Sequence, residues 1–300
     1  MKKHLLRLLL TLTLAALPGA LPAQPDAHYV PGIEGIGCAT LPPPGWYFRD
    51  YNVVYLAQQV DNGAGHNVAP VGFQALTYAN VPRLIFISGL QILGGYLGGD
   101  IVLPLVYNSV NAGPYRSSTF GVGDFYAENT LSWHPGHFDI GAAVGFWAPT
   151  GHSASPSQTQ PPTRAGSGFW TPELTLGATW HPDAAKTWSI SALNRYEFNT
   201  QDRDLPETPG QAWTLEWGVA RKVVQTIDCG VVGYYQQRVT ASSGPDPWAY
   251  PYSRVAAVGP EINVQIPSIK SFASLRYNYE FMAENRAQGH TIALTLTTRF

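Results

Sequence analysis

The stretch GHTIALTLTTRF, residues 289–300, ends the chain and decides the fold class. Its large apolar side chains alternate with threonines and Arg299. Those on the apolar face are Ile292, Leu294, Leu296 and Phe300. Successive side chains of a β-strand point to opposite faces, so this alternation predicts a strand with one apolar and one polar face.

The same alternation recurs in segments of roughly ten residues or more that begin at Asp124, Trp188 and Ala273. In each segment one face is apolar and the other carries full charges, such as Glu128 and Arg195. Charged residues make up only 13% of the chain, whereas a water-soluble domain has about a quarter. The apolar faces must therefore meet something other than water.

The lengths of the connections between these segments separate a β-sandwich from a membrane barrel. The expected long connections are Asp61–Ala79, Asn111–Thr119, Thr150–Ser167, Thr200–Gly210, Ser242–Ala249 and Ala283–Gly289. The expected short connections are Gly94–Gly99, His134–His137, His181–Lys186, Lys222–Gln225 and Pro267–Lys270. Long and short connections alternate, which is typical of outer-membrane barrels with long loops outside and short turns in the periplasm. The sequence thus predicts an all-β fold, an antiparallel transmembrane β-barrel of about 12 strands in the bacterial outer membrane.

The tryptophans agree with this orientation, because aromatic rings at both membrane interfaces form the girdles of such barrels. Those at the expected periplasmic strand ends are Trp46, Trp133, Trp180 and Trp188, and those at the outer ends are Trp147, Trp170 and Trp213. Trp147 is an exception, since strand parity places it on the inner face with Asp139.

The first residues have the pattern of an export signal. Lys2, Lys3 and Arg7 precede an apolar run and a group of small residues that ends at Ala23. This order is typical of a secretory signal peptide, so we expect residues 1–23 to be cleaved off. The alternative, an N-terminal anchor helix, requires about 20 apolar residues, and this run is shorter.

Residues 24–45 are not strand-like, because they contain Pro25, Pro31 and Pro42–Pro44. They also carry several large apolar side chains, too many for a free tail. Two interpretations stay open: a periplasmic extension, or a short plug that enters the barrel mouth and occludes the path. The barrel itself is expected over residues 46–300.

The charged faces of the strands supply the candidate functional residues. An arginine that faces lipid near the bilayer midplane costs about 2–4 kcal/mol, so charged side chains are expected to face the lumen. The expected lumen-lining residues are Asp100, Asp124, Glu128, Arg195, Glu197, Glu216, Asp228, Arg238, Arg276 and Glu280, with Asp50 in the same role. They would either tune the selectivity of a polar path or form a salt-bridged filling that conducts little.

Other kinds of site are less well supported. His152 and Ser153 are adjacent in one outer loop, and His290 and Thr291 in another, but no third group completes a catalytic set. His134 and His137 flank a Pro-Gly turn without a carboxylate cluster, so no metal site is predicted. No glycine-rich phosphate loop is present, and we expect no cofactor.

Charge and cysteine content limit the partners. Without the signal peptide, 15 of the 18 basic residues remain against 20 acidic ones. Such a chain has no broad basic surface, so no nucleic-acid partner is expected. Parity places Cys229 on the lipid-facing side, and Cys38 precedes the first strand, so we expect two isolated thiols rather than a disulfide.

Four stretches carry a resemblance to a known family: HYVPGIEGIGCATLPPPGWYFRDYN, GVGDFYAENTLSWHPGHFDIGAAVGFWAPTG, GFWTPELTLGATWHPDAAKTWSISALNRYEFNT and ENRAQGHTIALTLTTRF. They resemble the transporters named after the meta-pathway of phenol degradation, over most of the chain from His28 to Phe300. The resemblance implies an outer-membrane protein that takes up aromatic or other hydrophobic compounds, and it offers no catalytic residues to carry over.

We therefore expect a channel or transporter, not an enzyme, that passively admits small solutes through the outer membrane. Its expected partners are the lipid bilayer, a small-molecule solute and the barrel-assembly machinery, for which Phe300 would be the assembly signal. The alternatives are a structural or adhesin-like barrel that acts through its extracellular loops, and a lipid-modifying outer-membrane enzyme.

Overall fold

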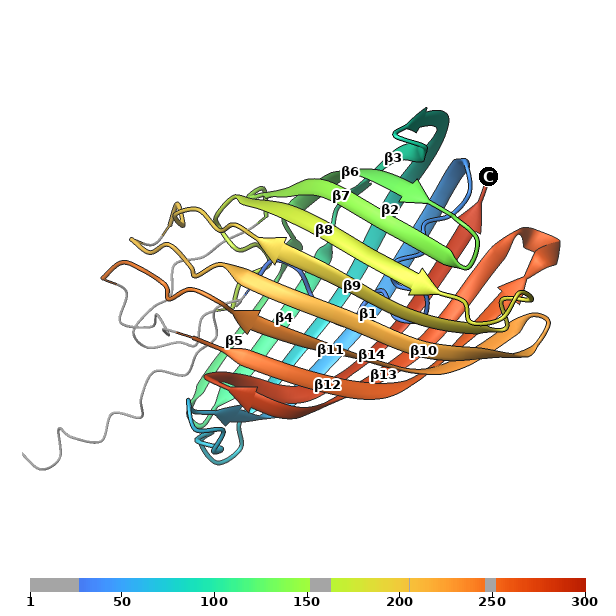
Figure 1. Ribbon diagram of the computed structural model, residues 1–300. Coiled ribbons are helices and arrows are strands. Elements are labelled where there is room, and N and C mark those ends of the chain that lie inside the picture. Colours follow the sequence, from blue (N-terminus) through green and yellow to red (C-terminus); the bar gives the residue numbers. More distant parts are fainter. Residues whose placement is uncertain (1–26, 152–162, 205, 246–251) are drawn as a thin grey trace, which may run out of the picture.

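The chain forms one β-barrel in a computed structural model that describes residues 27–151, 163–204, 206–245 and 252–300 (Figure 1). Its strand segments are β1 (Gly45–Asp61), β2 (Gln74–Ile92), β3 (Gly95–Val102), β4 (Leu105–Ala112), β5 (Tyr115–Val122), β6 (Phe125–Trp133), β7 (Phe138–Ala148), β8 (Thr171–Trp180), β9 (Trp188–Glu197), β10 (Ala212–Val224), β11 (Ile227–Arg238), β12 (Arg254–Ile266), β13 (Ser271–Glu284) and β14 (Arg286–Arg299). A single 3-10 turn, η1 (Pro267–Ile269), joins β12 to β13.

The segments combine into twelve wall strands. β3 and β4 pair with successive parts of β2, and β6 and β5 pair with β3 and β4 in turn. The two short gaps contain Pro104, which has no N–H to donate, and Gly123. β3–β4 and β5–β6 are therefore two interrupted strands, and β1 closes the barrel by pairing with both β2 and β14. The predicted antiparallel barrel of about 12 strands is confirmed.

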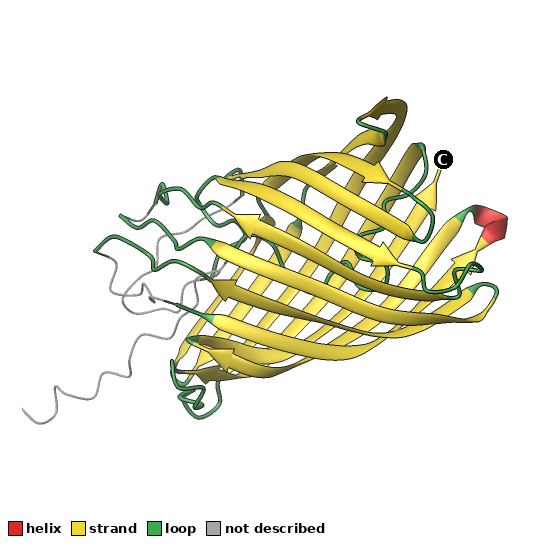
Figure 2. Ribbon diagram, viewed as in Figure 1, coloured by secondary structure: helices red, strands yellow, loops and turns green. Residues whose placement is uncertain are grey.

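The long connections all lie at one end of the barrel, as Figure 2 shows. Four long connections lie at one end, over residues 62–73, 149–170, 198–211 and 239–253. The opposite end has short turns at residues 93–94, 134–137, 181–187 and 225–226, together with η1. We call the two ends of the barrel the loop end and the turn end.

Two of the expected long connections are wrong. The chain turns within two residues at Gly113, and β13 is followed by β14 after Asn285 alone. Both turn residues have positive φ, 64° for Gly113 and 54° for Asn285. The residues next to these two turns are largely polar, because water can reach the outward side chains at the ends of the hairpins. Their composition therefore resembles that of a loop, although they belong to paired strands. The expected turn Gly94–Gly99 is likewise only residues 93–94, because β3 begins at Gly95.

The last strand has the predicted faces. Ile292, Leu294 and Leu296 are exposed on the outside of the barrel, while Ala293 and Thr295 are buried inside. Phe300 is also exposed, and its N–H donates to the carbonyl of Trp46 on β1. The apolar residues of this strand therefore belong to the outer wall.

One predicted lumen residue faces the other way. Asp50 lies on the outer face of β1, because its neighbours Arg49 and Tyr51 point inward. Its carboxylate accepts hydrogen bonds from the side chains of Asn52 and Asn80, which replace part of its hydration. The expectation for Asp50 was wrong, because the alternation of β1 is shifted by one residue from the assumed parity.

No helix in the described residues is long and apolar enough to cross a membrane.

Candidate functional site

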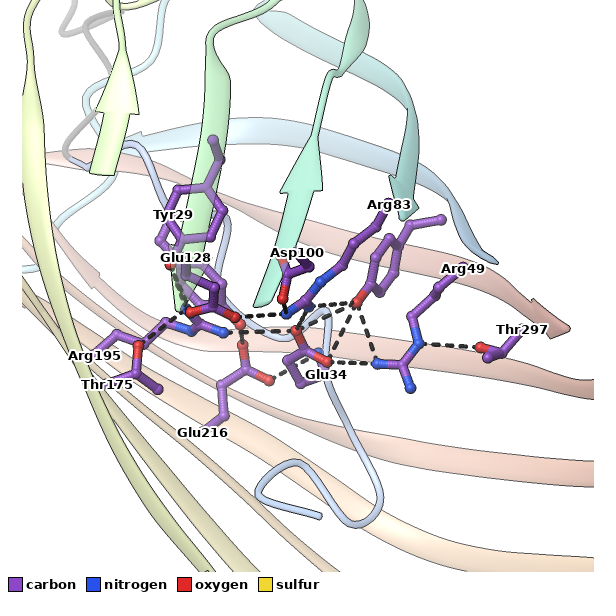
Figure 3. Close-up of polar contacts among 12 residues, drawn as sticks. Tyr29, Glu34, Arg49, Arg83, Asp100, Glu128, Thr175, Arg195, Glu216 and Thr297 are labelled. Carbon is purple, nitrogen blue, oxygen red and sulfur yellow. Dashed lines mark hydrogen bonds and ion pairs between the residues drawn. The ribbon is translucent and has the colours of Figure 1, made fainter. Parts of the chain in front are cut away.

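The N-terminal segment, residues 27–44, runs through the barrel lumen, and Figure 3 shows its central part among the wall side chains. Its start lies near the loop end, where His28 contacts Asp124, and its end lies near the turn end, where the Arg299 guanidinium donates to the carbonyl of Pro44. The segment turns at Gly32, Gly35 and Gly37, whose φ angles are positive. It has no strand partner, so its buried N–H groups need acceptors elsewhere.

Three wall glutamates supply those acceptors. Glu197 on β9 accepts from the N–H groups of His28 and Tyr29, at 2.7 and 3.1 Å. Glu216 on β10 accepts from Gly32 and Glu34, at 2.9 and 3.1 Å, and Glu261 on β12 accepts from Ile36 at 2.8 Å. We call Glu197, Glu216 and Glu261 the clamp glutamates. Each replaces backbone pairing that an irregular segment cannot supply for itself.

Glu34 is the centre of a buried charge cluster (Figure 3). Its Oε2 lies 3.0 Å from Arg49 Nη1, and its Oε1 lies 2.7 Å from Arg83 Nη1 and 3.7 Å from Arg195 Nη2. The Tyr51 hydroxyl contacts the same carboxylate. Burial alone would raise the pKa of Glu34, but the guanidiniums of Arg83, Arg49 and Arg195 outweigh it and lower that pKa to about 2.

Wall carboxylates complete the cluster around two of these arginines. Arg83 Nη2 lies 2.7 Å from both Asp100 Oδ2 and Glu128 Oε1. Arg195 Nη1 lies 2.5 Å from Glu173 Oε1, and its guanidinium stacks 4.4 Å from the centre of the Tyr29 ring. The cluster therefore spans the lumen from β1, β2, β3 and β6 to β8 and β9, with the N-terminal segment between the two sides.

A second group of contacts holds the start of the segment. The His28 ring nitrogens lie 2.9 Å from Asp124 Oδ2 and 2.7 Å from Thr171 Oγ1, and the ring stacks on Trp147. Asp124 also accepts from the N–H groups of Gly151 and Ser167, which belong to the connection after β7. Wall, loop and segment thus meet at one carboxylate. Trp147 lies inside, as its parity predicted.

Nine of the ten predicted lumen residues are buried: Asp100, Asp124, Glu128, Arg195, Glu197, Glu216, Arg238, Arg276 and Glu280. Asp100, Glu128 and Arg195 belong to the cluster around Glu34. Arg276 holds Glu261 at 2.8 Å, and Glu280 accepts from the hydroxyls of Tyr55 and Tyr234.

The remaining candidate, Asp228, lies apart from the cluster. It is only partly buried near the turn end of β11, opposite Lys222. The site also contains residues that the sequence interpretation did not include, namely Glu34, Arg49, Arg83, Glu173 and Glu261.

The candidate catalytic pairs do not form a site in the described residues. His152 and Ser153 lie outside them. His290 contacts Tyr277 on the outer wall, whereas Thr291 is buried on the inner face, so the wall separates the two side chains.

Metal ligands and disulfides are also not found in the described part of the chain. It contains no group of three or more His, Cys, Asp or Glu side chains arranged to hold a metal. His134 contacts Asp139, and His137 contacts the carbonyl of His181. Cys38 and Cys229 are both free thiols.

Two cavities lie on either side of the charge cluster. The larger, of about 410 Å³, is on the loop-end side and is lined mainly by apolar residues such as Ile33, Val53 and Val106, with the hydroxyl-bearing Tyr51 and Tyr55. Its lining also includes the charged side chains of Asp124, Arg164, Glu280 and Arg286. The smaller, of about 60 Å³, is on the turn-end side and is lined by the cluster itself, together with Thr40 and Leu41. The N-terminal segment contributes to both linings.

A closed antiparallel barrel with an apolar outer wall, a charged interior and its long connections at one end is an outer-membrane β-barrel. Residues 57–296 match the family model described as "Putative MetA-pathway of phenol degradation", and the chain belongs to that family. The loop end is accordingly the extracellular end, and the turn end is the periplasmic one.

Solved structures share the fold. A crystal structure of an outer membrane channel from Pseudomonas putida F1 is similar with a TM-score of 0.76 at 15% sequence identity, covering 91% of this chain and all of that one. The β domain of the Bordetella autotransporter BrkA has a TM-score of 0.52 at 9% identity, covering 85% of this chain and 99% of its own. No protein of curated function matches the chain in sequence.

Proposed function

We propose that this protein is a passive outer-membrane channel for small solutes with an apolar body, and that the N-terminal segment is a plug that occludes it at rest. The observation that carries the proposal is the position of the segment. It lies across the lumen between a cavity of about 410 Å³ that faces the extracellular loops and a cavity of about 60 Å³ on the periplasmic side. A solute in the larger cavity would therefore have to displace the segment to pass.

The larger cavity favours small apolar or aromatic solutes. Its volume lies within the range of small-molecule sites, about 300–1,000 Å³. Mostly apolar walls with a few hydroxyl-bearing and charged side chains are suited to a compound with a hydrophobic body and one or two polar substituents. The family description, which refers to phenol degradation, points to the same class of compound.

The channel is tested by conductance in planar bilayers. We expect rare, small openings from the full mature protein and steady openings from a variant that lacks residues 27–41. Uptake of a radiolabelled aromatic by cells that express either form should increase in the same order. If the truncated variant is fully folded and remains silent in both assays, the channel proposal fails, and a barrel that acts through its extracellular loops becomes the better interpretation.

We further propose that Phe300 is an assembly signal for the barrel-assembly machinery. Its ring is exposed at the periplasmic end of β14, where another protein can reach it. Deletion of Phe300 is expected to lower the amount of protein in the outer membrane several-fold while export to the periplasm continues. Fractionated immunoblots check this, and Arg299→Lys, which leaves Phe300 at its position, is the control. Equal outer-membrane levels in all three strains would contradict the proposal.

A further inference from the structure

The cluster around Glu34 has the form of a carboxylate-binding site built by the barrel wall. Three guanidinium nitrogens point at one carboxylate, from Arg49 on β1, Arg83 on β2 and Arg195 on β9. Guanidinium groups bind carboxylates through directed, charge-assisted hydrogen bonds. All three donors come from the wall, whereas the carboxylate comes from the N-terminal segment. The Glu34 carboxylate can therefore leave the site with the segment, while the three arginines stay in the wall.

The charges of the wall show what the site would need if Glu34 left. Arg83 keeps Asp100 and Glu128 as partners, and Arg195 keeps Glu173. Arg49 has its ion pair with Glu34, and its remaining hydrogen bonds go to the neutral hydroxyls of Thr297 and Tyr51. Departure of Glu34 would leave Arg49 without an ion-pair partner in the cluster. The carboxylate of an external molecule would supply one.

The position of the site connects it to the path of a solute. Glu34 and the three arginines line the smaller cavity, while the adjacent Ile33 and Tyr51 line the larger, apolar one. A molecule with an apolar body in the larger cavity could thus place a carboxylate at the arginines. A neutral molecule of the same shape has no negatively charged group to bind the arginines.

We propose, building on the channel function proposed above, that Arg49, Arg83 and Arg195 recognise the carboxylate of an organic acid with an apolar body, and that Glu34 occupies this site at rest as a tethered substitute. The acid competes with Glu34 and so favours release of the segment. Glu34 thus acts as an internal competitor that sets the concentration of acid needed to release the segment.

The test uses benzoate as the probe and its uncharged relative benzamide as the control ligand. In detergent at constant ionic strength, we expect benzoate to bind Glu34→Gln saturably in calorimetry and to raise its melting temperature, with benzamide at least tenfold weaker. The wild type should bind benzoate at least tenfold more weakly than Glu34→Gln. Adding Arg49→Gln to Glu34→Gln should abolish the benzoate effect while the far-UV spectrum of the barrel is retained.

Two outcomes would overturn the site. One is equal binding of benzoate and benzamide to Glu34→Gln, and the other is unchanged benzoate binding after Arg49→Gln. Should Glu34→Gln fail to fold, the wild type and Arg49→Gln are compared at high benzoate, where a difference is still expected. Conductance of the same samples separates the two proposals. Steady conductance without benzoate binding refutes the site alone, and benzoate binding by a barrel that never conducts refutes the channel alone.

Discussion

Replacing Glu34 by glutamine is expected to destabilise the docked N-terminal segment by about 3 kcal/mol at pH 7. The pKa of Glu34 falls from 4.5 to about 2 on docking, and each pKa unit corresponds to about 1.4 kcal/mol. Removal of one partner of a buried ion pair generally destabilises a folded structure by about 3–5 kcal/mol, which agrees in sign and size with this expectation. Hydrogen–deuterium exchange of residues 27–44 measures the change directly, as faster exchange of the N–H groups that the clamp glutamates hold.

The same substitution should change the response to acid. A carboxyl group with a lowered pKa stabilises the docked state fully above about pH 4.5, and this contribution is lost as the pH falls through about 2. Relative to the intrinsic exchange rate at each pH, the protection of the wild-type segment should therefore fall between pH 4.5 and 2, and Glu34→Gln should lack that part of the response. Glu284→Gln, which breaks an exposed pair with Arg254, is the matched control and should leave both results unchanged. An acid response that persists in full in Glu34→Gln would show that another group is responsible.

Replacing Gly35 by alanine is expected to expel the N-terminal segment from the lumen. A Cβ at this position would lie 2.0 Å from Glu261 Oε2 and 2.2 Å from Arg276 Nη2. Those two side chains form a buried ion pair, so neither can move without losing its partner. The φ of Gly35 is +68°, which adds a conformational penalty of about 1–2 kcal/mol. We expect protease to cleave the segment at least tenfold faster and the channel to open more often.

Gly37→Ala separates the two effects. Gly37 has nearly the same φ, +66°, but a Cβ there would find its nearest neighbour, Thr40, at 3.8 Å. Gly37→Ala therefore has the conformational penalty of a positive φ but no steric clash. Cleavage of Gly37→Ala should increase only a few-fold. If both variants behave alike, backbone conformation rather than the packing of Gly35 against Glu261 and Arg276 keeps the segment in place.

The fold could be predicted because the membrane imposes a simple rule on every strand. Alternation in β6, β9, β13 and β14 marks inside and outside residue by residue, and nine of the ten charged candidates chosen from such alternation are buried. The rule fails where alternation is ambiguous, as at Asp50, whose neighbour Arg49 is also charged and takes the inner position. It also fails where polar composition resembles a loop, as in the hairpin around Gly113.

The site could be predicted only in part, since its central element follows no period. Glu34 lies in a segment without alternation, so nothing in its neighbourhood marks it as the partner of three arginines. Arg83 follows Pro82, and proline has no N–H for a central strand, yet β2 continues through both residues. Most of the clamp contacts use backbone N–H groups, which every residue except proline has. The pairing of wall and segment therefore appears only in three dimensions.

The clamp contacts also imply an order of events during biogenesis. The segment is made before any wall strand, yet its partners are distant in the sequence: His28 binds Glu197, 169 residues away, and Ile36 binds Glu261, 225 residues away. Contacts of such long sequence separation form late. The segment must therefore stay undocked through secretion and strand insertion, and its docking is expected to be the final maturation step of the barrel. Until that step the segment does not cross the lumen, so newly inserted molecules are expected to pass solutes more freely than mature ones.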